Sequence, residues 1–408
     1  MIEIAIDTSK NRSSSIRLPL SKSVLNRELV LLGEQVRSRS FETSLWPEDS
    51  SRMLALLLSD EKNLDVGPAG TTMRFMTAFF ACGEREIHLS GTERLNQRPI
   101  APLVEALRDL GADIDYQHRP GFPPLHILPV RSIGGTIQVT AQVSSQFISA
   151  LLLNGHCMEK GLELEILPPI TSRPYIDMTL SILDRAGIEV VQERNVLKIR
   201  PGAVDSEFEL SQEKDWSAAA YFYGLIATGA LDELTLSGLT MESVQGDRIL
   251  AELFRPLGVR STSTTEGIQL NRDTPSIDRL RLDLKDHPDL AQPIVFTSFA
   301  MGIPCELTGL ATLPIKETDR LSAMQEVLSG FSAQVEIGED HISVSGRPVA
   351  PSECILPSYD DHRMVMSYIL LATRVEKLKI EGHEAVAKSF PDFWDQCAQI
   401  GFDIRTAI

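Results

Sequence analysis

The stretch LVEALRDLGADIDY, residues 103–116, predicts an amphipathic helix that ends at Gly111 and leads into a short strand. A glycine after the last helical residue suits the left-handed backbone conformation that ends many helices. The residues after Gly111 are typical of a short strand. This stretch therefore predicts a helix–turn–strand segment, which is called a phrase below.

The same phrase returns along the chain. Further copies are TLSILDRAGIEVV from Thr179, ILAELFRPLGVRS from Ile249, LSAMQEVLSGFSAQVEI from Leu321 and FWDQCAQIGFDI from Phe393. The five closing glycines, Gly111, Gly187, Gly258, Gly330 and Gly401, are by subtraction 76, 71, 72 and 71 residues apart. A unit of about 70 residues is longer than solenoid repeats and fits a small α/β subdomain. A helix without the glycine, SSRMLALLLSD from Ser50, completes a set of six.

A more apolar helix precedes each of these phrases. Its starts read SKSVLNR at Ser21, AGTTMRF at Ala69, SSQFISA at Ser144, KDWSAAA at Lys214, DHPDLAQ at Asp286 and DDHRMVM at Asp360. Short β-type runs bounded by Gly and Pro separate the helices. We expect an α/β (α+β) protein of two domains with three units each. Residues 19–213 form one domain, residues 1–18 plus 214–408 form the other, and ligands bind in the cleft between them.

Composition excludes several classes of protein. The 408 residues are 43% hydrophobic and 23% charged, which is ordinary for a soluble globular chain. The five cysteines are scattered without CxxC spacing, so we expect no disulfide framework and no thiolate metal site. A net charge of −17 disfavours nonspecific binding to nucleic acid or to an acidic membrane. We expect a cytoplasmic monomer with no signal peptide, no membrane span and no nucleic-acid partner.

Several helix starts carry polar and cationic side chains. At SKSVLNR, residues 21–27, a helix begins close to Ser21, with Lys22 and Arg27 in its first two turns. Free N–H groups at a helix N-terminus favour anions, and the two cations add to that preference. If the inner helices point their N-termini at the cleft, these residues meet there: Lys22, Ser23, Arg27, Gly70, Arg74, Ser144, Ser145, Gln146, Asp289, His362 and Arg363, joined from the outer helices by Arg98, Ser172, Tyr175, Lys316, Glu317 and Arg320. Small ligands with phosphate and carboxylate groups fit this set.

Each motif also has a simpler structural explanation. Taken alone, Ser144 to Gln146 is better explained as an ordinary helix N-cap. Lys316 and Arg320, at i and i+4, are like charges that repel unless an anion lies between them, which favours a functional site. The pair His383-Glu384 lacks the second histidine of a zinc motif, and the spacing shows neither a metal cluster nor a Walker A or dinucleotide fingerprint.

Two carboxylates stand among these cations. Asp289 and Glu317 are placed where a closed cleft would let them act as general base and general acid.

At this point the motifs resemble the 5-enolpyruvylshikimate-3-phosphate (EPSP) synthase family, also called 3-phosphoshikimate 1-carboxyvinyltransferase. The resemblance runs from Leu18 to about Trp394 and is carried by SKSVLNR, AGTTMR, the RPI at Arg98, VSSQF, SRPYID, SVQGD, the PD ending at Asp289, IKETDR, DDHRM and AKSFPDF. It implies two domains of three βαβαββ-type repeats in a pseudo-threefold arrangement. It also implies transfer of the enolpyruvyl group of phosphoenolpyruvate to the 5-hydroxyl of shikimate 3-phosphate, releasing phosphate, without a cofactor or metal. The product leads to chorismate and the aromatic amino acids.

The resemblance also assigns roles to residues. Shikimate 3-phosphate would be held by Lys22, Ser23, Arg27, Ser144, Ser145, Gln146, Ser172, Tyr175, Asp289 and Lys316. Phosphoenolpyruvate would be held by Lys22, Gly70, Arg98, Gln146, Arg320, Arg363 and Lys388, with Arg74 nearby. Glu317 would protonate the methylene carbon, while Asp289, with Lys22, would take the proton of the hydroxyl.

Three positions depart from the family pattern. Leu20 stands where the family usually has Gly, Pro68 where it usually has Asn, and Thr312 where Asn is common. None of them removes an acid, a base or a principal cation. We expect activity with altered affinity for phosphoenolpyruvate and for glyphosate, the inhibitor of the family.

Other functions stay open from the sequence. UDP-N-acetylglucosamine enolpyruvyltransferases share the architecture, but they typically have Asn after the first-helix Lys and a reactive Cys or Asp before the RP motif. Here Ser23 follows Lys22, and the loop reads GTERLNQRPI. A catalytically silent small-anion-binding protein of the same fold is the alternative from another class. RNA cyclases built on related units are disfavoured by the net charge.

Overall fold

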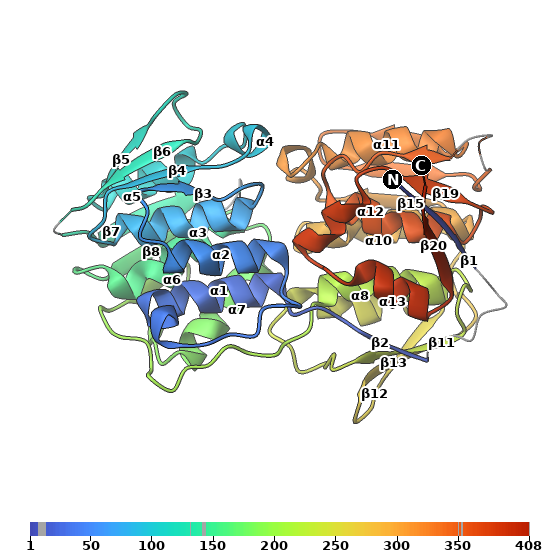
Figure 1. Ribbon diagram of the computed structural model, residues 1–408, viewed down its shortest axis with the longest axis horizontal. Helices are drawn as coiled ribbons and strands as arrows, with labels where there is room; N and C mark the ends of the chain where they lie inside the picture. Colours follow the sequence, from blue (N-terminus) through green and yellow to red (C-terminus); the bar gives the residue numbers. More distant parts are fainter. Residues whose placement is uncertain (7–13, 131, 141–143, 350, 352–353, 408) are drawn as a thin grey trace. The chain divides into compact units, whose positions relative to one another are not determined.

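The structure is a computed structural model that describes residues 1–6, 14–130, 132–140, 144–349, 351 and 354–407. Its internal contacts divide the chain into two compact units (Figure 1). Unit 1 comprises Met1–Ser21, Leu45–Glu48 and Glu213–Ile408, and unit 2 comprises Lys22–Ser44 and Asp49–Gln212. No helix among the described residues is both long enough and apolar enough to span a bilayer.

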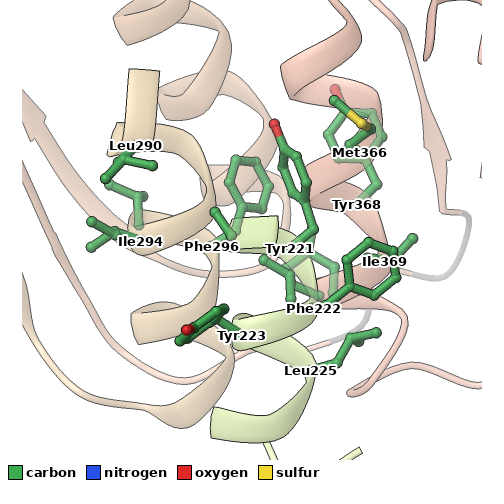
Figure 2. Packing of buried hydrophobic residues seen from close by; sticks show 14 of the residues in the cluster. Tyr221, Phe222, Tyr223, Leu225, Leu290, Ile294, Phe296, Met366, Tyr368 and Ile369 are labelled. Atoms are coloured by element: carbon green, nitrogen blue, oxygen red, sulfur yellow. The ribbon is translucent and has the colours of Figure 1, made fainter. Parts of the chain in front are cut away.

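Unit 1 is built around three apolar helices. These are α8 (Trp216–Ala227), α10 (Ala291–Met301) and α12 (His362–Leu371), and each of them packs against the other two. A helix that is apolar on all sides belongs in a core, and nearly every residue of the three is buried. Figure 2 shows side chains from all three helices in this core, among them Tyr221, Phe296 and Tyr368. The rings of Phe296 and Tyr368 meet edge to face with centroids 5.9 Å apart.

Gly224 on α8 explains how closely these helices approach. A Cβ atom added at Gly224 would lie 2.5 Å from Oγ1 of Thr297 on α10 and 2.5 Å from Cδ2 of Leu370 on α12. Such contacts are too short for any side chain, so only glycine lets the three helices meet at this point.

The outer helices of unit 1 lie around this core, and three sheets accompany them. The helices are η3 (Gly246–Ile249), α9 (Leu250–Leu253), η4 (Pro288–Leu290), η5 (Leu313–Ile315), α11 (Arg320–Gly330), η6 (His383–Lys388) and α13 (Phe393–Gln399). The strands are β1 (Ile2–Ile6), β2 (Ser15–Arg17), β11 (Glu233–Ser237), β12 (Val259–Ser263), β13 (Gly267–Arg272), β14 (Leu280–Asp283), β15 (Cys305–Thr308), β16 (Gln334–Ile337), β17 (Ile342–Ser345), β18 (Ile355–Leu356), β19 (Leu378–Ile380) and β20 (Phe402–Thr406).

Unit 2 repeats this plan. Its helices are α1 (Lys22–Leu32), η1 (Gly33–Ser38), α2 (Glu48–Leu58), α3 (Gly70–Ala81), α4 (Glu93–Asn96), α5 (Ala101–Asp109), α6 (Ser145–Asn154), η2 (Gly155–Cys157) and α7 (Arg173–Arg185). The strands are β3 (Asn63–Asp65), β4 (Ile87–Ser90), β5 (Asp113–Tyr116), β6 (Leu125–Leu128), β7 (Gly135–Thr140), β8 (Leu162–Leu167), β9 (Val190–Glu193) and β10 (Val196–Ile199). Here α1, α3 and α6 pack against one another as the central helices.

All five four-stranded sheets of the described residues share one topology. Their orders are β3-β4-β6-β5, β7-β8-β10-β9, β14-β15-β17-β16, β2-β11-β13-β12 and β18-β19-β1-β20. In each, the first pair is parallel and the remaining pairs are antiparallel. In the last sheet the N-terminal strand β1 takes the place that the fourth strand has elsewhere, so the start of the chain closes its final repeat. The sixth repeat, around α1 and α2, has no such sheet in the described residues.

The expected mixed α/β class is confirmed, and two local predictions need correction. Gly111, Gly187, Gly258 and Gly401 have the positive φ expected after a helix, but Gly330 does not. It is the last residue of α11, and Ser332 adopts the left-handed conformation instead, with φ 66°. The phrase from Ile249 forms only the four residues of α9 after a 3-10 turn, because Pro256 follows closely and cannot continue a helix.

Candidate functional site

Seven charged residues of unit 1 form a connected network, here called the carboxylate–cation cluster. Its members are Asp289, Lys316, Glu317, Arg320, Asp361, Arg363 and Lys388, three carboxylates and four cations. The excess of cations suits a site that takes up a further anion. The sequence predicted six of these residues and missed Asp361.

Helix starts bring these residues together. Asp289 lies on the 3-10 turn η4 just before α10, and Arg320 is the first residue of α11. Arg363 is in the first turn of α12, whose N-cap Asp361 accepts a hydrogen bond from the Arg363 N–H at 2.9 Å. The capping carboxylate offsets the unfavourable position of an arginine at a helix N-terminus.

Asp289 is surrounded by three cations. Its Oδ1 lies 3.2 Å from Nη1 of Arg320 and 3.7 Å from Nζ of Lys316, and its Oδ2 accepts a 2.8 Å hydrogen bond from Nη2 of Arg363. Burial by itself would raise the pKa of Asp289, but Arg363, Lys316 and Arg320 outweigh burial and hold the pKa well below its usual range. Asp289 is therefore ionised at neutral pH.

Glu317 lies between two cations, one of which, Arg320, it shares with Asp289. Oε2 of Glu317 is 3.0 Å from Nη2 of Arg320, and Oε1 is 3.1 Å from Nζ of Lys388. Burial lowers the pKa of Arg320, while Asp361, Glu317 and Asp289 raise it and more than compensate. Arg320 therefore stays charged although it is almost fully buried.

Unit 2 carries a second group of predicted residues at the starts of its central helices. Arg27 on α1 is 2% exposed and joins three helices. Its Nε donates to Oγ1 of Thr179 on α7 at 2.8 Å, and its Nη2 donates to Oγ of Ser149 on α6 at 3.1 Å. Nη1 and Nη2 also donate to the carbonyl oxygens of Ser23 and Tyr175. Burial lowers the pKa of Arg27 to about 10, since its hydrogen-bond partners in the described part of the chain are neutral oxygens.

Two guanidinium groups converge on the N-terminus of α3. A Cβ added at Gly70 would lie 2.6 Å from Nη1 of Arg98 and 2.9 Å from Nη1 of Arg74. Arg74 Nη1 also donates to the Gly70 carbonyl at 2.8 Å. Gln146 on α6 reaches the same helix start, because its Nε2 donates to Oγ1 of Thr71 at 3.2 Å. The glycine thus leaves room for two cations beside free backbone N–H groups.

The remaining predicted residues of unit 2 lie at helix starts as well. Lys22 begins α1 and pairs through Nζ with Oδ2 of Asp49 at 3.1 Å. Ser144 caps α6 by accepting from the Gln146 N–H at 3.2 Å, directly after residues 141–143, which lie outside the described residues. Ser145 is buried in the first turn. Ser172, just before α7, has φ 55°, a conformation that non-glycine residues rarely adopt and that clusters at functional sites.

Comparison with known proteins tests the resemblance. Residues 8–397 match the family model described as EPSP synthase (3-phosphoshikimate 1-carboxyvinyltransferase). A 3-phosphoshikimate 1-carboxyvinyltransferase from Bacteroides fragilis is 36% identical over 400 residues, covering 96% of each chain. One from Cellvibrio japonicus is 32% identical over 427 residues, covering 97% of this chain and 99% of the relative.

Solved structures agree in fold. The EPSP synthase of Acinetobacter baumannii superposes over 100% of both chains with a TM-score of 0.74 at 20% identity. The enolpyruvyl transferase NikO of Streptomyces tendae superposes with a TM-score of 0.70 at 13% identity, covering 99% of this chain and 98% of its own. The predicted family and fold class are both confirmed. The chain belongs to the EPSP synthase family, the 3-phosphoshikimate 1-carboxyvinyltransferases.

Proposed function

We propose that the residues of unit 1 and unit 2 described above divide the work of enolpyruvyl transfer between shikimate 3-phosphate and phosphoenolpyruvate. Unit 2 holds most of the shikimate 3-phosphate. Unit 1 supplies the acid, the base and the cations that stabilise the negative charge on the phosphate of phosphoenolpyruvate. The observation that carries this proposal is the carboxylate–cation cluster, because two carboxylates held among four cations can move protons beside an anionic substrate.

Hydroxyl groups and one arginine in unit 2 suit shikimate 3-phosphate. Ser144, Ser145 and Ser172 lie at the starts of α6 and α7, where backbone N–H groups favour a phosphate. Tyr175 follows on α7. Arg27 lacks a carboxylate partner among the described residues, so the substrate carboxylate would neutralise it, with Ser23 beside it. Gln146, with Lys22, Asp289 and Lys316, completes the set.

The proposed ligands of phosphoenolpyruvate come from both units. In unit 2, Arg98 lies at Gly70 and Gln146 reaches the same helix start, while Lys22 begins α1. In unit 1, Arg320, Arg363 and Lys388 are the cations. Charge-assisted hydrogen bonds from guanidinium groups suit both the carboxylate and the phosphate of this substrate.

Glu317 then acts as the acid and Asp289 as the base. When the two anionic groups of phosphoenolpyruvate bind Arg320 and Lys388, the positive charge that stabilises the Glu317 carboxylate is neutralised, which favours its protonated form. Glu317 can then protonate the methylene carbon. The resulting cationic centre is attacked by the 5-hydroxyl, whose proton passes to Asp289 with the help of Lys22. In the elimination, the methyl group gives its proton back to the Glu317 carboxylate as the C=C bond reforms and the C–O bond to phosphate breaks. The departing phosphate takes up the proton held by Asp289, and the fixed cations stabilise its charge.

The protein would act as a monomer in the cytoplasm. All five cysteines are unpaired, which suits a reducing compartment. Light scattering on the purified chain measures its oligomeric state, and a dimer at micromolar concentration would contradict the proposal.

The experiment that tests the function measures inorganic phosphate release with shikimate 3-phosphate and phosphoenolpyruvate, each alone and then together. Release only when both are present supports the proposal. UDP-N-acetylglucosamine in place of shikimate 3-phosphate serves as the control and should give no release. If no phosphate is released with both substrates, and the folded protein still binds shikimate 3-phosphate, the result would instead support a binding protein that has no catalytic activity.

A further inference from the structure

The outward face of the sheet β3-β4-β6-β5 in unit 2 carries two histidines side by side. On β4 the residues Ile87 and Leu89 are fully buried, and on β6 so are Leu125 and Ile127. Side chains alternate along a strand, so the residues between them, His88 and His126, point away from the core. They are direct partners in the antiparallel register of the two strands.

The two imidazole rings stack face to face. Their centroids are 4.2 Å apart and their planes differ by 4°. Glu86, two residues before His88 and on the same face, reaches both of them. Its Oε1 lies 3.2 Å from Nε2 of His126 and 3.9 Å from Nε2 of His88. Two imidazole nitrogens and a carboxylate oxygen therefore share one small space.

The neighbours of this triad orient it. Nδ1 of His88 lies 2.6 Å from the side-chain amide of Gln117, which follows β5. The atom nearest Nδ1 is Nε2 of the amide; turning the amide by 180° brings its oxygen there to accept the Nδ1 proton, which leaves the Nε2 lone pair of His88 facing Glu86. Nζ of Lys62 lies 2.7 Å from Oε2 of Glu86, which leaves Oε1 for the histidines.

We propose that Glu86, His88 and His126 form a binding site for a divalent transition-metal ion of borderline softness, for which Zn²⁺ is the probe. One ligand atom from each residue lies within 4.8 Å of the others. Bonds of about 2.0–2.2 Å to nitrogen and oxygen then require the two stacked rings to tilt, so that one ion lies in the plane of both. Two histidines and one glutamate are a donor set that zinc accepts, and the partial exposure of all three leaves the fourth position to water.

This site is independent of the residues proposed for the two substrates. None of its three ligands carries a role in enolpyruvyl transfer. The spacing in the sequence concealed it, because His88 and His126 are 38 residues apart by subtraction and only strand pairing brings them together. The sequence predicted no metal site, and this proposal departs from that expectation. A bound ion would cross-link β4 to β6 and so slow hydrogen exchange in these strands.

The test uses the full chain without an affinity tag, stripped of metal with a chelator. Zn²⁺ is titrated by calorimetry, and Co²⁺ is titrated for the visible absorption of a tetrahedral site. We expect one equivalent to bind and hydrogen exchange in β4 and β6 to slow. Substituting a residue that hydrogen-bonds a metal ligand typically weakens metal affinity roughly 10–100-fold, so Gln117→Ala should weaken Zn²⁺ binding about tenfold. His126→Asn and His88→Asn remove a ligand itself and should each weaken binding by more than that range.

His341→Gln is the matched control. His341 is a similarly exposed histidine whose Nδ1 lies 3.7 Å from a carboxylate oxygen of Asp340, but it belongs to no potential metal cluster of the described residues. It should leave Zn²⁺ affinity unchanged, and all of these variants should keep phosphate release at the wild-type rate. Absence of binding to the wild-type chain would overturn the proposal. So would equal binding to wild type and the His88 and His126 variants.

Discussion

Nε of Arg320 lies 2.7 Å from Oδ2 of Asp361, and the two side chains are 2% and 0% exposed. Nη2 of the same guanidinium lies 3.3 Å from Oδ1, so the pair is bidentate. The same guanidinium also contacts Asp289 through Nη1 and Glu317 through Nη2. Arg320 therefore has one orientation, and Asp361 is the residue that fixes it.

Substituting Asp361 should disturb both folding and turnover. Asp361→Asn removes the charge that pairs with a buried guanidinium, and breaking such a pair costs about 3–5 kcal/mol. Asn keeps the N-cap of α12, so the helix start survives. We expect a lower unfolding free energy of unit 1 and a higher KM for phosphoenolpyruvate. Urea unfolding followed by tryptophan fluorescence measures the first, because Trp46, Trp216 and Trp394 all belong to unit 1.

The neighbouring Asp360 provides the control for this variant. Asp360 is exposed, and Asp360→Asn should change neither quantity. If Asp361→Asn matched it in stability and in KM, the positioning role of Asp361 would be wrong.

Glu317→Gln should abolish the proposed proton donor without disturbing the fold. Glutamine has the same shape and can still accept from Arg320, but it cannot give up a proton at the methylene carbon. General acid catalysis contributes roughly 10²–10⁴-fold, and we expect kcat to fall by that factor. Phosphate release under saturating substrates measures it. Asp319→Asn, which keeps the N-cap of α11, is the control. Unchanged turnover would remove Glu317 from the role of acid.

The charge on Asp289 makes the stability of unit 1 depend on pH. The pKa of Asp289 in the folded protein is held below its unfolded value of about 3.9, so its stabilising effect is complete above that pH. As the pH falls below about 4, the unfolded chain takes up the proton first, and the stabilisation declines. The difference in unfolding free energy between wild type and Asp289→Asn should therefore be largest near neutral pH, at about 3 kcal/mol, and should shrink towards pH 2. A difference that stays constant between neutral pH and pH 2 would contradict this interpretation of the cluster.

The fold was predictable from the sequence where the signals are local. Apolar periodicity places α1 and α12, and a glycine places the end of α5, because each of these features acts within one or two turns of helix. The pairs Lys22–Asp49 and Arg320–Asp361 were not predictable, since their members are 27 and 41 residues apart and meet only after the helices pack. An acidic residue in the motif DDHR was visible, but nothing local indicates that its partner is Arg320.

Arg27 should matter more for binding than for stability. Burial lowers its pKa to about 10. Keeping the guanidinium charged in the folded protein at neutral pH therefore costs folding free energy. Arg27→Met removes that unfavourable term, and Ser149 and Thr179 still hydrogen-bond each other at 2.9 Å. We expect unit 2 to remain as stable as in wild type. Loss of a charged hydrogen bond of about 1.5–3 kcal/mol should raise KM for shikimate 3-phosphate roughly 10–150-fold.

Two measurements separate these effects. Circular dichroism during thermal unfolding reports the stability of the whole chain, and initial rates of phosphate release give KM. Arg39→Met is the control. Nη1 of Arg39 donates a 2.6 Å hydrogen bond to the Phe208 carbonyl, and Arg39 is not one of the predicted site residues. A large loss of stability in Arg27→Met with an unchanged KM would mean that the arginine is structural.

Gly70 offers the sharpest test of the phosphoenolpyruvate side. A Cβ at this position would lie 2.6 Å from one guanidinium nitrogen of Arg98 and 2.9 Å from one of Arg74. Both are tips of flexible side chains, so Gly70→Ala should fold normally while it pushes the two cations out of place. Misplacement of about 1 Å can reduce catalysis about 100-fold, and we expect KM for phosphoenolpyruvate to rise by up to that factor. KM for shikimate 3-phosphate should hardly change, because its proposed ligands lie at other helix starts. Gly83→Ala is the matched control, since the nearest atom to its Cβ would be the Phe80 carbonyl oxygen at an ordinary 3.4 Å. An equal rise in both KM values would mean that the substitution distorts unit 2 as a whole rather than the anion site at α3.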